Sequence, residues 1–182
     1  MIFSSLIAIM MLVGVVDDSL YVSTPSDVTA EMLRMADVDS SDVLYDLGSG
    51  AGRIVVTAAK WHGCRAVGVE LSEPLCVLAM RNVKNNSVEN LVTIRRGDVL
   101  DADLSDATVV CVYLMPGLLE RLKPKLSKLP PGTRIVANDK PIPGWRAEKT
   151  VTMYSTVTER EYTLYLYRIG KRPDRPACRG GT

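Results

Sequence analysis

The chain has 182 residues and is 47% hydrophobic, which fits one domain around a single core. Its 22 basic and 21 acidic residues give a net charge of +1, so the charge balance does not favour a polyanionic partner and we expect no nucleic-acid substrate. The cysteines are widely scattered, without a C-x-x-C pair or a Cys/His cluster, which predicts free thiols rather than a metal site or a disulfide framework. They are Cys64, Cys76, Cys111, which we expect in a core strand, and Cys178.

The two ends of the chain differ in character from the middle. Residues 1–20 form an apolar N-terminal segment, of which residues 1–16 are uncharged and shorter than the ~20 residues that cross a bilayer. They also lack the basic region and cleavage site of a signal peptide. Three interpretations stay open: a weak signal or anchor, a helix packed on the domain or a partner, and a membrane-edge segment. Residues 171–182 are polar and rich in Pro and Gly, which predicts a disordered tail and leaves residues 21–170 as the folded domain.

The first elements of this domain are a helix, a strand, a glycine turn and a second helix. Thr24-Pro25-Ser26-Asp27 is typical of a helix start, with Thr24 as the N-cap and proline at the first helical position. Val43 to Leu47 is an apolar run that predicts a buried strand, and it leads into glycines at alternate positions. The residues that follow place Ile54, Val55 and Ala58 on one helical face.

Strands then alternate with helices. Further strands are predicted over Ala66 to Glu70, Val92 to Asp98 with its turn, Thr108 to Met115, and Thr133 to Ala137. An amphipathic helix from about Ser72 to Asn86 carries Leu75, Leu78, Ala79 and Val83 on its apolar face, and a Leu-rich helix after Pro116 is expected to be disturbed near Pro124. Thr150 to Ser155 and Thr163 to Ile169 predict a closing antiparallel hairpin. This order indicates an α/β fold.

The glycine turn points to a particular ligand. Gly48, Gly50 and Gly52 follow G-x-G-x-G, whereas the dinucleotide fingerprint G-x-G-x-x-G would need glycine where the chain has Arg53. Glycines let the backbone approach a ligand, the next helix directs free N–H groups at an anionic end, and Asp46 offers a partner for a cation. S-adenosylmethionine carries both charges. We expect Arg53 to brace the loop through an acidic neighbour rather than to contact substrate.

With these motifs the chain resembles the class I S-adenosylmethionine-dependent methyltransferases. The resemblance implies a Rossmann-like three-layer sandwich with a seven-stranded, mostly parallel sheet whose last strand is antiparallel. It also implies that Glu70 binds the ribose hydroxyls and that Asp98 with Val99 lies against the adenine. The complete set of expected cofactor residues is Tyr21, Thr24, Asp46, Gly48, Ser49, Gly50, Gly52, Glu70, Leu71, Asp98, Val99 and Tyr113.

A narrower resemblance, over about Tyr21 to Ile169, is to the mitochondrial-type protein lysine methyltransferases and their small bacterial relatives. It rests on the Tyr-x-x-Thr-Pro lead-in, D-L-G-S-G-x-G-R-I-V, the tyrosine at the end of the fourth strand, and G-T-R-I-V followed by Pro-Gly-Trp. It implies N-methylation of a lysine in a protein, with Tyr113 and Trp145 as an aromatic slot for the alkyl-ammonium. Two positions depart from the group: Ala51 replaces an acid, and Asn138-Asp139-Lys140 replaces a polar-aromatic sequence.

Other functions stay open at this point. A methyltransferase acting on a small molecule and a non-catalytic protein that binds S-adenosylmethionine are the alternatives. Because S-adenosylmethionine is made and used in the cytosol, we expect a cytoplasmic location, with membrane association through residues 1–16 as an option. The sequence names neither the acceptor nor the oligomeric state.

Overall fold

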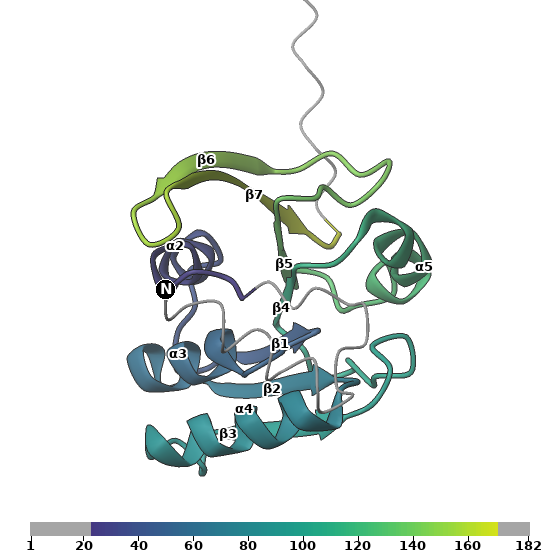
Figure 1. Cartoon of the computed structure of the whole chain (residues 1–182). Coiled ribbons are helices and arrows are strands. Elements are labelled where there is room, and N and C mark those ends of the chain that lie inside the picture. The colour runs from purple at the N-terminus through teal and green to yellow at the C-terminus, as the bar shows by residue number, and fades with distance from the viewer. Residues whose placement is uncertain (1–22, 171–182) are drawn as a thin grey trace, which may run out of the picture.

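A single sheet forms the centre of the molecule (Figure 1). The computed structural model describes residues 23–170, so the apolar segment, Tyr21 and the polar tail lie outside the described residues. Within this range seven strands lie in the order β3-β2-β1-β4-β5-β7-β6. Their bounds are β1 Val43–Leu47, β2 Arg65–Glu70, β3 Val92–Arg96, β4 Val109–Val112, β5 Arg134–Asn138, β6 Lys149–Ser155 and β7 Arg160–Arg168. The helices are α2 Ser26–Met35, α3 Arg53–His62, α4 Glu73–Asn85 and α5 Pro116–Leu126.

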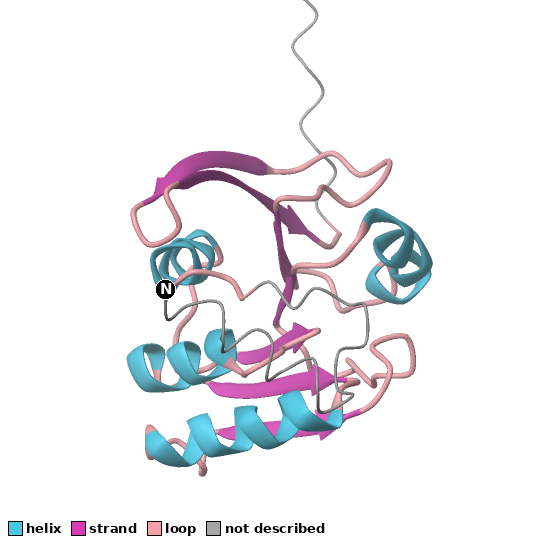
Figure 2. Ribbon diagram, viewed as in Figure 1, coloured by secondary structure: helices cyan, strands magenta, loops and turns pink. Residues whose placement is uncertain are grey.

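Helices cover both faces of the sheet, as Figure 2 shows. Strands β1 and β4 are buried at every position, which explains their unbroken apolar sequences. On one face, Leu44, Cys111 and Val136 pack with α2 and α3; on the other, Tyr45, Val110 and Ile135 pack with α5. Side chains alternate between these two clusters along each strand. The expected three-layer, seven-stranded fold is therefore confirmed.

The order of the strands reverses between β1 and β4, and this determines where a ligand can bind. Strands β1 to β5 are parallel, with β1 between β2 and β4. Their carboxyl ends therefore lie along one edge of the sheet, and ligands of such sheets bind outside the strand ends where the connections diverge. Only β7 runs antiparallel to its neighbours β5 and β6, so its first residue, Arg160, lies toward that same edge. The last strand is antiparallel as expected.

A buried ion pair joins the opposite edge of the sheet to helix α2. The Arg134 guanidinium pairs with Asp42, and it also donates to the carbonyl oxygens of Ala36 at 2.7 Å and Asp37 at 2.9 Å. Thr108 donates to the same Asp42 carboxylate at 2.6 Å. The Asp42 side chain is 5% exposed and the Arg134 side chain 15%, so the buried carboxylate depends on this cation.

The structure corrects several details at the ends of elements. Helix α2 begins at Ser26 with Pro25 as its N-cap and no capping side chain, so the prediction of Thr24 as the N-cap is wrong. Instead, Asp27 accepts from its own helix at the Val28 N–H and from Ser155 at the end of β6. The predicted fourth strand, Thr108 to Met115, is only four residues long.

Helices α4 and α5 also differ in detail from the prediction. Leu78 is exposed rather than buried, because α4 directs Cys76, Ala79 and Val83 inward. Helix α5 continues two residues past Pro124 before it ends. Free buried thiols are confirmed for Cys64, Cys76 and Cys111. Within residues 23–170, no helix combines the length and apolarity needed to cross a membrane.

Candidate functional site

The glycine turn after β1 lies on the carboxyl edge of the sheet and is built for a close backbone approach. Gly48 has φ +81°, and a Cβ there would lie 2.9 Å from Leu114. The N–H groups of Gly48 and Ser49 donate to the Val69 carbonyl at 2.9 and 3.0 Å, which fixes the turn to β2. Helix α3 then begins at Arg53, so its free N–H groups face the turn. The Ser49 hydroxyl is buried and has no hydrogen-bond partner in the described part of the chain.

Two buried carboxylates stand beside this turn. Asp46 is only 3% exposed; burial and the charge of Glu70 raise its pKa to about 7. Glu70 accepts from the Gly50 N–H and the Ser72 N–H, each at 2.8 Å, so its carboxylate joins the glycine turn to the start of α4. Asp46 receives no such hydrogen bond from residues 23–170. A buried carboxylate without hydrogen-bond donors around it is stabilised in its ionised form by a bound cation.

The residues expected at the adenine lie farther along the same edge. Asp98 is exposed and accepts from the Leu100 N–H at 2.9 Å, while Val99 is buried in the cluster under α5. Leu71, directly after β2, is 67% exposed. An apolar side chain this open beside the strand ends is a suitable surface for a flat ring.

The segment before α2 contacts the start of α3. Arg53 Nε donates to the Ser23 hydroxyl at 3.1 Å, so the expected brace exists, but its partner is a hydroxyl and the prediction of an acidic neighbour is wrong. Thr24 is buried, although it does not cap α2. Asp27 also accepts from the Thr156 N–H at 3.0 Å, which joins α2 to the turn between β6 and β7.

Tyr113 follows β4, the strand beside β1, and belongs to a cluster that the sequence did not predict. Its hydroxyl donates to Asp139 at 3.2 Å and accepts from Arg160 at 3.1 Å, and Arg160 also pairs with Asp139. The Arg160 guanidinium lies 4.0 Å from the ring centroid of Tyr162. Asn138, beside Asp139, is fully buried, and its amide atoms have no hydrogen-bond partner among residues 23–170.

Trp145 is placed elsewhere. Its ring packs edge-to-face on Tyr167 with centroids 5.9 Å apart, within the cluster under α5. Tyr113 instead contacts Asp139 and Arg160 on the α2 side of the sheet. The structure therefore does not bring Tyr113 and Trp145 together as a slot, because the two residues follow opposite faces of the sheet.

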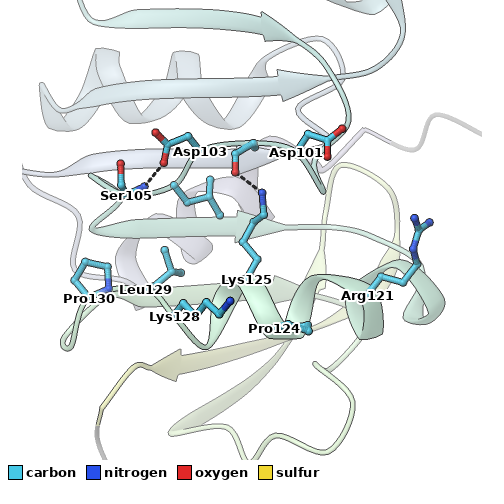
Figure 3. Close-up of a pocket in the computed structure, with 11 residues that line it drawn as sticks. Asp101, Asp103, Ser105, Arg121, Pro124, Lys125, Lys128, Leu129 and Pro130 are labelled. Carbon is cyan, nitrogen blue, oxygen red and sulfur yellow. Dashed lines mark hydrogen bonds between the residues drawn. The ribbon is translucent and has the colours of Figure 1, made fainter.

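A separate groove lies between the 101–105 loop and the end of α5 (Figure 3), with a volume of about 640 Å³. Lys125 donates to the Ala102 carbonyl across it, and Asp103 accepts from the Ser105 N–H at 3.0 Å. Residues predicted to bind cofactor or acceptor do not line it. It belongs to the connection from β3 to β4 rather than to the site.

The residues along the carboxyl edge fit S-adenosylmethionine. Asp46 matches its ammonium, the N-terminus of α3 its carboxylate, and the glycine turn leaves room for the chain between them. The buried Ser49 hydroxyl, which has no hydrogen-bond partner among residues 23–170, supplies a further polar group for the ligand. The roles of the individual residues remain predictions.

Comparisons with known proteins agree with this geometry. The family model of the ANTKMT methyltransferase domain matches residues 46–149. A protein-lysine N-methyltransferase of Saccharolobus islandicus is 40% identical over 83% of this chain and 94% of its own length. The adenine nucleotide translocase lysine N-methyltransferase of Mus musculus is 36% identical over 57% of this chain and 45% of its own length.

A solved structure is similar over most of the chain. It is named as an RNA methyltransferase from Salinibacter ruber in complex with S-adenosyl-L-homocysteine, and it is 42% identical with a TM-score of 0.77. The alignment covers 85% of this chain and 98% of that protein. Together, the fold, the glycine turn and these matches show that the chain belongs to the ANTKMT methyltransferase family of S-adenosylmethionine-dependent enzymes.

Proposed function

We propose that the enzyme methylates the side-chain nitrogen of a lysine in a protein. The observation that carries this proposal is the similarity, over 83% of this chain and 94% of the relative, to a protein-lysine N-methyltransferase. The site adds support, because the carboxylates of Asp46 and Asp139 at the carboxyl edge are suited to cations. The absence of an inserted domain among residues 23–170 also suits an acceptor that covers the site itself.

When bound, S-adenosylmethionine supplies a methyl group attached to a positively charged sulfur. A neutral amine attacks the methyl carbon in line with the carbon–sulfur bond, and the sulfur leaves as a neutral thioether. Asp46 and the N-terminus of α3 hold the two charged groups of the amino-acid end, and Glu70 is proposed to accept from the ribose hydroxyls. Tyr113 stands at the end of β4, next to β1, where it borders the approach of the acceptor. Exclusion of water by the acceptor protein lowers the cost of a neutral lysine.

Labelling identifies the product of the reaction. The purified full chain is incubated with methyl-labelled S-adenosylmethionine and a cell extract that includes the membrane fraction. We expect label in protein, recovered as methyl-lysine after acid hydrolysis. The Asp46→Asn variant, which keeps the shape of the side chain, serves as the control for cofactor-dependent labelling.

Other outcomes distinguish the alternatives. Nuclease-sensitive label would favour RNA, the substrate that the name of the Salinibacter ruber enzyme indicates, and would refute the lysine proposal. Label only in small metabolites would favour a small-molecule acceptor.

The cytoplasmic location is likewise a proposal. Separating the extract into soluble and membrane fractions before detecting the enzyme tests it.

A further inference from the structure

The carboxyl edge holds a row of polar side chains on the α2 side of the sheet. Leu44, Cys111 and Val136 lie on this side in β1, β4 and β5. Since side chains alternate along a strand, Asp46 and Asn138, two positions later in β1 and β5, share that side. Tyr113 follows β4 and joins them there, because its hydroxyl contacts Arg160, whose guanidinium lies over Tyr162 of the same cluster. Asp46 pairs in register with Cys111 and Cys111 with Val136, so Asn138 lies two strands away and two residues farther toward the carboxyl edge, roughly 12 Å from Asp46. The row extends from the proposed ammonium site of the cofactor toward Asp139.

Asp139 carries the features of a binding group rather than of a surface turn. Its backbone is in the left-handed region at φ +59°, which is uncommon for a residue with a side chain. Its side chain is 16% exposed. The residue before it, Asn138, is fully buried with an unpartnered amide, so polar groups gather here without satisfying one another.

The position of the Asp139 carboxylate does not depend on Arg160. Tyr113 donates to one carboxylate oxygen at 3.2 Å, and the Thr163 N–H donates to the other at 3.4 Å. The Asp139 N–H in turn donates to the Thr163 carbonyl at 2.8 Å. These contacts come from β4 and β7 and would persist without the guanidinium.

Arg160 resembles a substrate in how it is held. Its guanidinium lies over the Tyr162 ring and pairs with Asp139, which is the combination of aromatic face and carboxylate that binds an alkyl-ammonium. The Tyr162 ring is 2% exposed, whereas the Arg160 side chain is 46% exposed and enters from the first position of β7. The cation can therefore leave while the ring and the carboxylate stay.

We infer that Asp139, with Tyr113 and the Tyr162 ring, forms the subsite for the acceptor ammonium, and that Arg160 occupies this subsite until an acceptor lysine displaces it. The inference rests on the proposed function. It assigns the acceptor side to residues at the end of β5 and the start of β7.

The test compares Asp139→Asn and Arg160→Gln with Arg168→Gln as a matched control. Arg168 also lies on β7 and pairs with an acid, Glu148, but at the opposite end of the strand. Each protein is saturated with S-adenosyl-L-homocysteine, and its affinity for n-butylammonium, the end of a lysine side chain, is measured by calorimetry or NMR titration. Neutral n-pentanol shows how much binding is due to the alkyl chain alone.

The two site variants should change affinity in opposite directions. Arg160→Gln should bind n-butylammonium about tenfold more tightly than the natural chain, because its competitor is gone, and Asp139→Asn on the order of tenfold more weakly. Arg168→Gln and n-pentanol should show no such change. A purely structural ion pair predicts instead that both site variants lose thermal stability and neither gains affinity; that result would overturn the inference.

The inference can fail while the proposed function stands. If extracts give methyl-lysine but Asp139→Asn leaves the KM for the labelled protein unchanged, the subsite is elsewhere. If the variants shift n-butylammonium affinity as expected but the label is found in RNA, the lysine function is wrong and the cation subsite remains. Should Asp139→Asn fail to fold, Arg160→Gln alone decides, because unchanged affinity in that variant refutes the displacement.

Discussion

Lowering the pH should weaken cofactor binding through one residue, Asp46. Burial and the neighbouring charge of Glu70 raise its pKa to about 7, so in the unliganded enzyme near neutral pH the carboxyl group is partly protonated. A cofactor ammonium requires the ionised form, so each pH unit below about 7 should raise the Kd about tenfold. From about pH 7, where about half of the carboxyl groups are ionised, to pH 5, where about one in a hundred is, this amounts to roughly 50-fold, or about 2 kcal/mol.

Stability should respond to the same group with the opposite trend. The folded pKa of Asp46 lies above the unfolded value of 3.8, so between about pH 4 and pH 7 the folded chain binds more protons than the unfolded chain. Its contribution to the free energy of unfolding is therefore present at acidic pH, falls as pH rises through about 7, and then levels off. In the unliganded enzyme, Asp46→Asn should remove this contribution to the pH dependence.

Calorimetric titration with S-adenosyl-L-homocysteine between about pH 5 and pH 7 measures the binding effect, because the ammonium of this ligand stays mostly charged over this range. Asp46→Asn is the control: it should bind more weakly at neutral pH and should show little change with pH. A natural chain whose Kd is flat over this range, or that follows the same curve as the variant, would refute the assignment of Asp46 as the ammonium site.

Three further predictions concern stability and access. Arg134→Met should cost about 3 to 5 kcal/mol in the free energy of unfolding by urea, because it leaves Asp42 buried without its cation; a loss below about 1 kcal/mol would contradict the pairing. Gly48→Ala should weaken cofactor binding, since the added Cβ meets Leu114 at 2.9 Å and φ is +81°; unchanged binding would mean that the turn relaxes without cost. In a Cys178→Ser background, a thiol reagent should react at mildly alkaline pH only after unfolding, because burial protects Cys64, Cys76 and Cys111; rapid labelling of the folded protein would contradict this burial.

The elements that bury apolar surface could be predicted from the sequence, since their patterns follow directly from the sheet. The uninterrupted apolar runs of β1 and β4 reflect strands covered on both faces, and the alternating pattern of β6 and β7 reflects a hairpin at the edge. The glycine turn was identifiable because positive φ angles restrict the choice of residue. Details at element ends were less predictable: Leu78 has helical spacing, but α4 lies on the edge of the sheet and buries only a narrow stripe.

The acceptor side could not be derived from local pattern. Asp139 and Arg160 are 21 residues apart and meet only because β7 returns antiparallel along β5. The slot predicted from Tyr113 and Trp145 did not form, because Trp145 packs on Tyr167 while Tyr113 contacts Asp139. Both residues follow the end of a strand, and the sequence alone does not determine which face of the sheet such a residue packs on. The signal in the sequence was that Asn138-Asp139-Lys140 differs from the polar-aromatic sequence that the resemblance leads us to expect.

The reversal of strand order between β1 and β4 also divides the chain into two successive parts that contribute to different proposed sites. Up to the turn after β3, the chain encodes most of the surroundings proposed for the cofactor; from β4 onward, it encodes the border where the acceptor is proposed to approach. Variation in the second part would therefore change the choice of acceptor and leave most of the proposed cofactor site unaltered. Relatives of this enzyme could diversify in target while inheriting the first half intact, and an engineer who exchanges the region from β5 to β7 would be following the same division.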